Sequence, residues 1–158
     1  MNTDSPVGNE PAKLVEHSER LTNIFGYWPS FHDAEVIEFA LWRGDVDPEK
    51  DRYIGPVLTT KIHLWELTCE MDTTGHCVLR HETLAVLRFH EMEDLQFEGF
   101  NHQNAIYGLS ITAEPRKDLP DAIRVEFEPA FGLTGTFRCS RIEVVSAEPY
   151  PRNEQRQA

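Results

Sequence analysis

The sequence has few basic residues for its number of acidic ones. Fifteen lysines and arginines face 27 aspartates and glutamates in 158 residues, which gives a formal net charge of -12 at pH 7. Binding to nucleic acid or to anionic lipid requires Lys and Arg side chains that neutralise phosphates. A folded domain with this charge should therefore repel both and attract a basic protein. The same charge would also serve solubility alone.

Long hydrophobic runs and closely spaced cysteines are missing too. No stretch approaches the length of a transmembrane helix, and the polar, acidic N-terminus does not resemble a signal peptide. The three cysteines, Cys69, Cys77 and Cys139, do not suggest a disulfide framework. We therefore expect a cytoplasmic protein that does not associate with membranes.

The motifs of common catalytic and metal sites are absent. The chain contains no G-x-S-x-G, no glycine-rich phosphate loop, no C-x-x-C and no H-E-x-x-H. Ser30, His32 and Asp33 lie close in sequence, and a small metal-dependent hydrolase that uses His32, Asp33 and Glu35 is one alternative. Nothing around these residues predicts a nucleophile, so we expect no catalytic residue, no cofactor and no metal ion.

The chain has the length of one domain with a substantial core, and it is short for two. Residues 1–10 are polar and are predicted to be disordered. Residues 11–150 are predicted to form a single domain, and residues 151–158 a frayed tail. A helix is predicted over residues 11–25, because apolar residues recur there at helical spacing and Gly26 follows as a stop.

After this helix the apolar residues alternate, which predicts strands. The expected strands span residues 34–41, 58–65, 83–89, 95–98, 106–112, 123–128, 135–139 and 142–145. In the first of them Val36 should face one side and Phe39 the other. The connections are too short for crossover helices, so the pairing should be mainly antiparallel. We therefore predict an α+β, mainly β fold, with one N-terminal helix packed on an antiparallel sandwich or open barrel of about eight short strands.

Large rings gather at the junction between the predicted helix and the first strand. The segment Gly26–Glu35 carries three aromatic residues, a proline, a histidine and two carboxylates. Rings at such a junction either fill the core or face a partner. We expect Trp28 and Phe31 to be buried, because the turn fixed by Pro29 presents them to the core. His32 and Asp33 should then bind nearby backbone groups.

A second unusual segment, Leu95–Asn104, ends in side-chain amides. Asn101, Gln103 and Asn104 can each donate to and accept from the backbone of an irregular loop. The same groups could offer a polar recognition surface. We favour the structural use, because amide side chains commonly stabilise turns.

The segments Phe25–Glu35 and Leu95–Asn104 resemble sequence blocks of the bacterial immunity protein 50 family. The closing segment Ile142–Tyr150 is similar in character, and the resemblance covers about residues 20–150. It implies a protein of a polymorphic toxin system that neutralises a cognate toxin in the producing cell, and it carries over no catalytic residues. The residues that match the family blocks are Trp28, Pro29, Phe31, His32, Asp33, Glu35, Gly99, Phe100, Asn101, Gln103 and Asn104.

The resemblance and the acidic charge together predict stoichiometric binding of a basic toxin. Nucleases are basic because their substrate is a polyphosphate, and an acidic inhibitor can be steered onto one. A housekeeping or scaffold β-protein without a toxin partner is the other alternative. Two charged connections should contribute most to an acidic, partner-binding face. Their acidic residues are Asp45, Asp47, Glu49, Asp51, Glu91, Glu93 and Asp94.

Overall fold

The computed structural model of the protein describes residues 10–151. The predicted disordered segment and the predicted tail therefore lie almost entirely outside the described residues. The helical elements are a 3-10 helix, η2 (Pro11–Leu14), and an α-helix, α1 (Glu19–Phe25). The strands are β1 (Val15–Glu16), β2 (Glu35–Trp42), β3 (Asp45–Asp47), β4 (Arg52–Ile54), β5 (Val57–Met71), β6 (Cys77–His90), β7 (Glu93–Glu98), β8 (Ile106–Glu114), β9 (Ala122–Pro129), β10 (Thr134–Cys139) and β11 (Arg141–Pro149).

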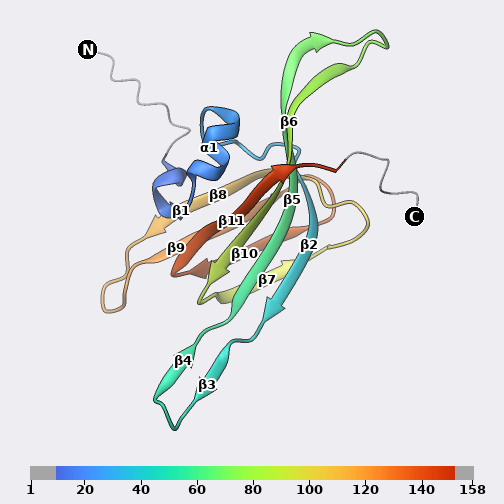
Figure 1. The fold of residues 1–158 in the computed structure, drawn as a ribbon. Coiled ribbons are helices and arrows are strands. Elements are labelled where there is room, and N and C mark those ends of the chain that lie inside the picture. Colours follow the sequence, from blue (N-terminus) through green and yellow to red (C-terminus); the bar gives the residue numbers. More distant parts are fainter. Residues whose placement is uncertain (1–9, 152–158) are drawn as a thin grey trace.

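Two open sheets pack face to face (Figure 1). One has the strand order β1-β11-β6-β5-β2, the other has the order β7-β10-β9-β8, and β3 and β4 form a separate hairpin. The ring centroid of Phe89 in β6 lies 6.2 Å from that of Phe127 in β9 and 5.0 Å from that of Phe137 in β10. All three rings are almost fully buried, so the core lies between the sheets. The predicted mainly β sandwich with one N-terminal α-helix is confirmed.

The predicted continuous helix over residues 11–25 is wrong in its first half. Val15 is buried and pairs with Ile142, so that β1 runs parallel to β11. His17 adopts a left-handed conformation, with φ of 58°, which interrupts helical geometry before α1 begins. The expected stop at Gly26 is correct, because this residue has φ of 84° and its N–H donates to the Thr22 carbonyl.

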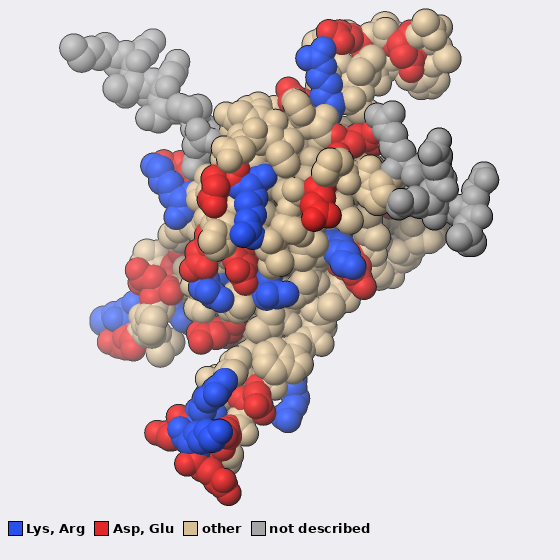
Figure 2. Space-filling model, in the orientation of Figure 1, with Lys and Arg blue, Asp and Glu red and all other residues tan. Residues whose placement is uncertain are grey.

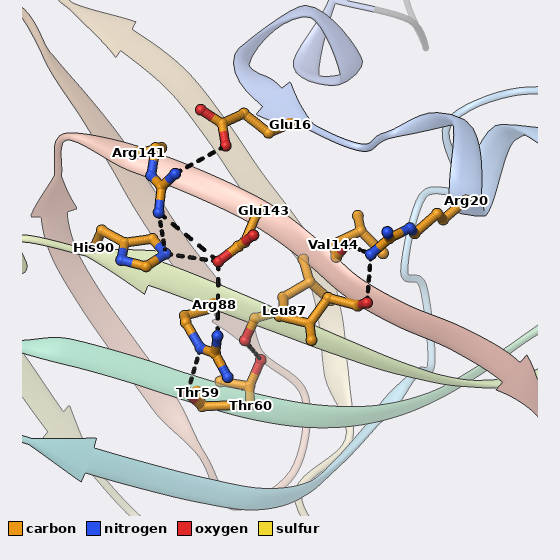
Figure 3. Close-up of polar contacts among 11 residues, drawn as sticks. Glu16, Arg20, Thr59, Thr60, Leu87, Arg88, His90, Arg141, Glu143 and Val144 are labelled. Carbon is orange, nitrogen blue, oxygen red and sulfur yellow. Dashed lines mark hydrogen bonds and ion pairs between the residues drawn. The ribbon is translucent and has the colours of Figure 1, made fainter.

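Helix α1 is fixed to the five-stranded sheet by apolar and polar contacts. Leu21 and Phe25 are buried on its inner side. The guanidinium of Arg20 donates to the carbonyl of Val144 at 2.9 Å and also to that of Val145 (Figure 3). The helix therefore holds a defined position beside β11, and the chain that follows it reaches the sheet at a fixed place.

The predicted alternation in β2 fails after Val36. The pairing register with β5 shifts between Val36 and Glu38, which is the mark of a β-bulge. The bulge brings Phe39 to the core side, where its ring centroid lies 4.1 Å from that of Phe97. Ile37 is left 43% exposed. The extra residue on one strand thus places Phe39 on the same side as Val36, opposite to the prediction.

Two hairpins project from the sandwich at opposite ends (Figure 1). Strands β5 and β6 extend beyond the predicted ranges and form one hairpin, whose turn lies at Asp72–Gly75. The charged connection between the predicted strands over residues 34–41 and 58–65 contains the short β3–β4 hairpin. Each hairpin has only two strands beyond the body of the sheet, so its outer part has no packed layer of its own.

Polar side chains join the strands on the outer surface of the five-stranded sheet (Figure 3). His90 Nε2 donates to Glu143 Oε1 at 2.8 Å, and the guanidinium of Arg88 lies 3.8 Å from the same oxygen. The hydrogen bond from His90 and the nearby arginines hold the pKa of the Glu143 carboxyl below its ordinary value. Arg141 also contacts Glu16 at 3.2 Å, which ties β1 to β11.

Candidate functional site

The junction before β2 is a rigid turn built around two rings. Trp28 and Phe31 are 3% and 2% exposed, and their ring centroids lie 5.7 Å apart. The predicted burial of both rings is confirmed, and Pro29 between them is buried as well. Phe31 and Asp33 both have positive φ, 60° and 63°. Such left-handed residues persist only where the surrounding structure fixes them, here through the buried rings.

The polar residues of this turn point outward. His32 and Asp33 are about half exposed, and His32 Nδ1 lies 3.1 Å from Asp33 Oδ2. The His32 backbone N–H donates to the Ser30 hydroxyl, and the Asp33 backbone N–H donates to the Ile106 carbonyl. The Ser30 oxygen thus accepts a turn hydrogen bond. Glu35 is half-buried, and its backbone bridges to the segment before β8.

The second family block forms a loop that is locked by Asn104. This side chain is 3% exposed, and its Oδ1 accepts the Asn101 N–H at 2.9 Å. Its Nδ2 donates to the Asn101 carbonyl at 2.7 Å and to the Val36 carbonyl at 3.4 Å. Because Val36 lies in β2 directly after the first family block, Asn104 ties the second block to the residue that follows the first. These hydrogen bonds give the amide a structural role in the loop.

The remaining residues of the second block shape the same loop. Asn101 donates to the Gly99 carbonyl and accepts the backbone N–H of Gln103. Gly99 has φ of 77°, and a Cβ there would lie 2.3 Å from the Gly132 oxygen, so only glycine fits. Phe100 is 44% exposed and extends the cluster of rings around Phe39 and Phe97 to the surface.

Four of the acidic residues expected to bind a partner lie on or beside the β3–β4 hairpin. These are Asp45, Asp47, Glu49 and Asp51. Lys50 and Arg52 lie in the same hairpin and Arg43 lies just before it, so positive and negative charges are mixed there. Figure 2 shows red and blue groups side by side on this hairpin, at the bottom of the view.

The other three expected residues lie between β6 and β7. Glu91 packs against Gly55 at the base of the hairpin, where a Cβ on Gly55 would lie 3.2 Å from the Glu91 Cα. Glu93 lies 3.1 Å from the Arg116 guanidinium, and Asp94 lies 2.5 Å from that of Arg138. The charge of Glu93 is therefore offset by Arg116, whereas Asp94 shares Arg138 with Glu114.

Two surface grooves open beside the family blocks. The aromatic groove, of about 240 Å³, lies between the junction and β5, and it is lined by Phe25, Tyr27, Pro29, Ser30, His32, Asp33, Trp65, Glu66 and Leu67. The amide groove, of about 340 Å³, is lined by Glu35, Val36, Ile37, His63, Phe100, Asn101, His102, Asn104 and Tyr150. Exposed residues of both blocks therefore border surface grooves. The buried rings of Trp28 and Phe31 support the turn that carries the exposed residues of the first block.

Three lining residues of the aromatic groove come from β5 and were missed as site candidates. Trp65 is the last residue of the predicted strand, Glu66 and Leu67 continue β5 beyond it, and Leu67 is 63% exposed. The continued run of apolar residues was a signal that could have found them. Glu66 accepts a hydrogen bond from Tyr27, and burial together with the charge of this carboxylate raises the pKa of the Tyr27 phenol.

Within residues 10–151, no group of three or more His, Cys, Asp or Glu side chains is arranged to hold a metal ion. In the described residues, Cys69 and Cys77 therefore do not form such a group with the histidines close to them in sequence. No helix in this part of the chain has both the length and the apolar character needed to cross a membrane.

A small β-sandwich that holds rings and carboxylates in surface grooves has the geometry of a binding module. The chain belongs to the Immunity protein 50 (Imm50) family, whose match covers residues 17–150. The suspected resemblance is confirmed over nearly the whole domain, and membership points to a non-catalytic inhibitor that binds a toxin. Searches of curated proteins and of solved structures each found no match.

Proposed function

We propose that this protein neutralises a cognate bacterial toxin by forming a stoichiometric complex with it. The observation that carries the proposal is the family match over residues 17–150, because it spans both sheets and both family blocks. The organisation of the grooves supports it. Rigid turns, buried anchors and half-exposed rings give a preformed surface, which lowers the entropic cost of binding.

The toxin is proposed to be basic and to act on nucleic acid in the cytoplasm of the producing cell. Residues 10–151 contain 25 acidic residues and 13 lysines and arginines, so the charge of -12 resides in the described domain. A nuclease must present a positive surface to its polyphosphate substrate. The field of this domain would attract such a surface, and it would repel nucleic acid and anionic lipid.

The acidic residues of the β3–β4 hairpin and Glu91 are proposed to act mainly in steering. All but the half-buried Asp47 are exposed, and those of the hairpin lie close in sequence to arginines and a lysine. They should therefore speed the encounter with a basic toxin more than they hold the complex together. Glu93 and Asp94 should contribute less, because an arginine already lies beside each of them. This steering should weaken as salt is added, since exposed charges are screened over about 8–10 Å near physiological ionic strength.

Co-expression tests the proposal directly. Each open reading frame that flanks the gene for this chain is expressed alone and then together with it in a sensitive host. One flanking product should stop growth when alone, and the full chain should restore growth and co-purify with that product. If no flanking product is both toxic and neutralised, the chain is not an immunity protein for its neighbours, and a housekeeping role is favoured instead.

A further inference from the structure

We propose that the basic toxin docks in the aromatic groove and along the apolar side of the projecting β5–β6 hairpin. The inference rests on the proposed function and deepens it by locating the contact surface. We define the docking surface as the aromatic groove together with Leu67, Met71 and Leu79. Its occupant is a toxin surface that carries arginine or lysine side chains among apolar ones.

The hairpin exposes apolar side chains that nothing in residues 10–151 covers. Leu67 lies opposite Leu79 in the strand pairing, and Met71 lies opposite Cys77. Leu67, Met71 and Leu79 are 63%, 66% and 38% exposed. A group of neighbouring exposed apolar side chains often marks a site of interaction with another protein. A ribbon of only two strands is also marginally stable in water, and a partner that covers one side would stabilise it.

The exposed apolar side chains continue without a break into the aromatic groove. Leu67 belongs to both, and the Tyr27 ring, 44% exposed, lies in the same groove. Phe25 is buried at the base and contacts the His81 ring of the hairpin, with 5.7 Å between centroids. The hairpin is thus anchored to α1 at its base, so that the groove is preformed while the outer hairpin remains uncovered (Figure 1).

Charge distinguishes this surface from the other projecting hairpin. Residues 25–35 and 65–82 contain six acidic residues and one arginine, Arg80. Residues 43–54, which span β3 and β4, contain four acidic residues and three basic ones. In Figure 2 the β5–β6 hairpin at the top is largely tan with red groups and a blue group beside one of them, whereas the lower hairpin carries more blue mixed with red. The excess of negative charge at the β5–β6 hairpin therefore complements a basic partner better than the mixed charge of the β3–β4 hairpin does.

The groove offers specific partners for a cationic side chain. The carboxylates of Glu66 and Asp33 both line it, and so does the ring of Tyr27. A guanidinium can bind a carboxylate through two hydrogen bonds and can also pack on an aromatic face. Interfaces commonly concentrate their binding energy in a few aromatic and arginine contacts of this kind. The toxin is therefore expected to insert an arginine beside Glu66.

The first test compares matched apolar substitutions on the two hairpins. The probe is the toxin identified by co-expression, made catalytically inactive, and the measurements are its association and dissociation rates with the full chain. Tyr27→Ala with Leu67→Ser should raise the dissociation constant at least thirtyfold, the effect typical of lost central contacts. Tyr53→Ala with Val46→Ser, at side chains 71% and 55% exposed on β4 and β3, should change it less than threefold.

The second test compares matched neutralisations of carboxylates. Asp33→Asn with Glu66→Gln should speed dissociation about tenfold, because both groups would lie within the interface. Asp51→Asn with Glu49→Gln should leave dissociation unchanged. Asp33 and Asp51 both have positive φ, which asparagine tolerates, so the two pairs of changes strain the backbone equally.

Several outcomes would overturn the proposal. Larger effects from the β3–β4 changes would place the interface on that hairpin, and unchanged binding in all variants would place it elsewhere. A parent that is dimeric without toxin, and that Leu67→Ser converts to a monomer, would assign the surface to a second copy. If the parent chain binds no flanking product, the proposed function itself is wrong. If the parent binds but the groove substitutions do not weaken binding, only the proposed docking surface is wrong.

Discussion

Replacing Asn104 by alanine should destabilise the fold without removing any contact with a toxin. The side chain is buried and makes two short hydrogen bonds with Asn101 and a longer one with the Val36 carbonyl. A net hydrogen bond contributes about 0.5–1.5 kcal/mol, and a buried group left without its partner costs about 1–3 kcal/mol. We expect Asn104→Ala to lower the free energy of unfolding by about 2–3 kcal/mol, given those ranges and the length of the third bond.

The assay is thermal and urea denaturation of parent and variant. For a domain of this size, a loss of 2–3 kcal/mol corresponds to a fall in Tm of about 5–10 °C. Gln103→Ala is the matched control, because Gln103 is exposed in the same loop and such changes usually stay within about 0.5 kcal/mol. If Asn104→Ala melts like Gln103→Ala, the amide does not tie the second family block to β2, and the reasoning fails.

Asn104→Asp separates lost hydrogen bonds from lost volume. The carboxylate keeps the shape of the side chain and can still accept from Asn101, but it cannot donate to the two carbonyls. The variant should be at least as unstable as Asn104→Ala at neutral pH, and it should recover partly on acidification, when the protonated acid regains one donor. A stability deficit that does not change with pH would contradict the assigned hydrogen bonds.

Three further predictions concern the fold. Trp28→Ala should cost about 3–5 kcal/mol in chemical denaturation, and a variant as stable as the parent would show that the ring does not fill the core. Gly99→Ala should cost clearly more than Gly75→Ala in thermal melts: both have positive φ, but a Cβ meets a backbone oxygen only at Gly99. Equal costs would refute the steric argument. Because His90 holds the pKa of Glu143 below its ordinary value, its network stabilises the fold above that ordinary value and is lost as the pH falls. Urea midpoints between pH 6 and pH 3 should therefore fall more steeply for the parent than for Glu143→Gln, and parallel profiles would contradict this.

The sequence revealed those parts of the fold that depend on local alternation. Apolar and polar residues alternate over Leu58–Trp65, Thr83–Phe89 is a nearly continuous apolar run, and both segments lie in paired strands. Burial of Trp28 and Phe31 followed from the fixed turn. The parallel pairing of Val15 was not predictable, because an apolar residue before a helix looks the same whether it is helical or pairs with a distant strand.

Other features depended on tertiary pairing. The bulge after Val36 left no mark in the sequence, since its residues suit either face of a strand. The aromatic groove joins Tyr27 to Glu66 across almost forty positions of chain, and tertiary contacts such as the pairing of β2 with β5 and the Phe25–His81 contact bring them together. The acidic residues were visible in the sequence, but the arginines beside Glu93 and Asp94 come from distant segments.

A titration of toxin activity tests the central claim most directly. The toxin identified by co-expression is held at a fixed concentration well above the dissociation constant, and its activity is measured as the full chain is added. Stoichiometric inhibition predicts a linear loss of activity that is complete at one chain per toxin. Complete inactivation by a small molar fraction of the chain would indicate catalytic turnover, and full activity in excess chain would contradict the account altogether.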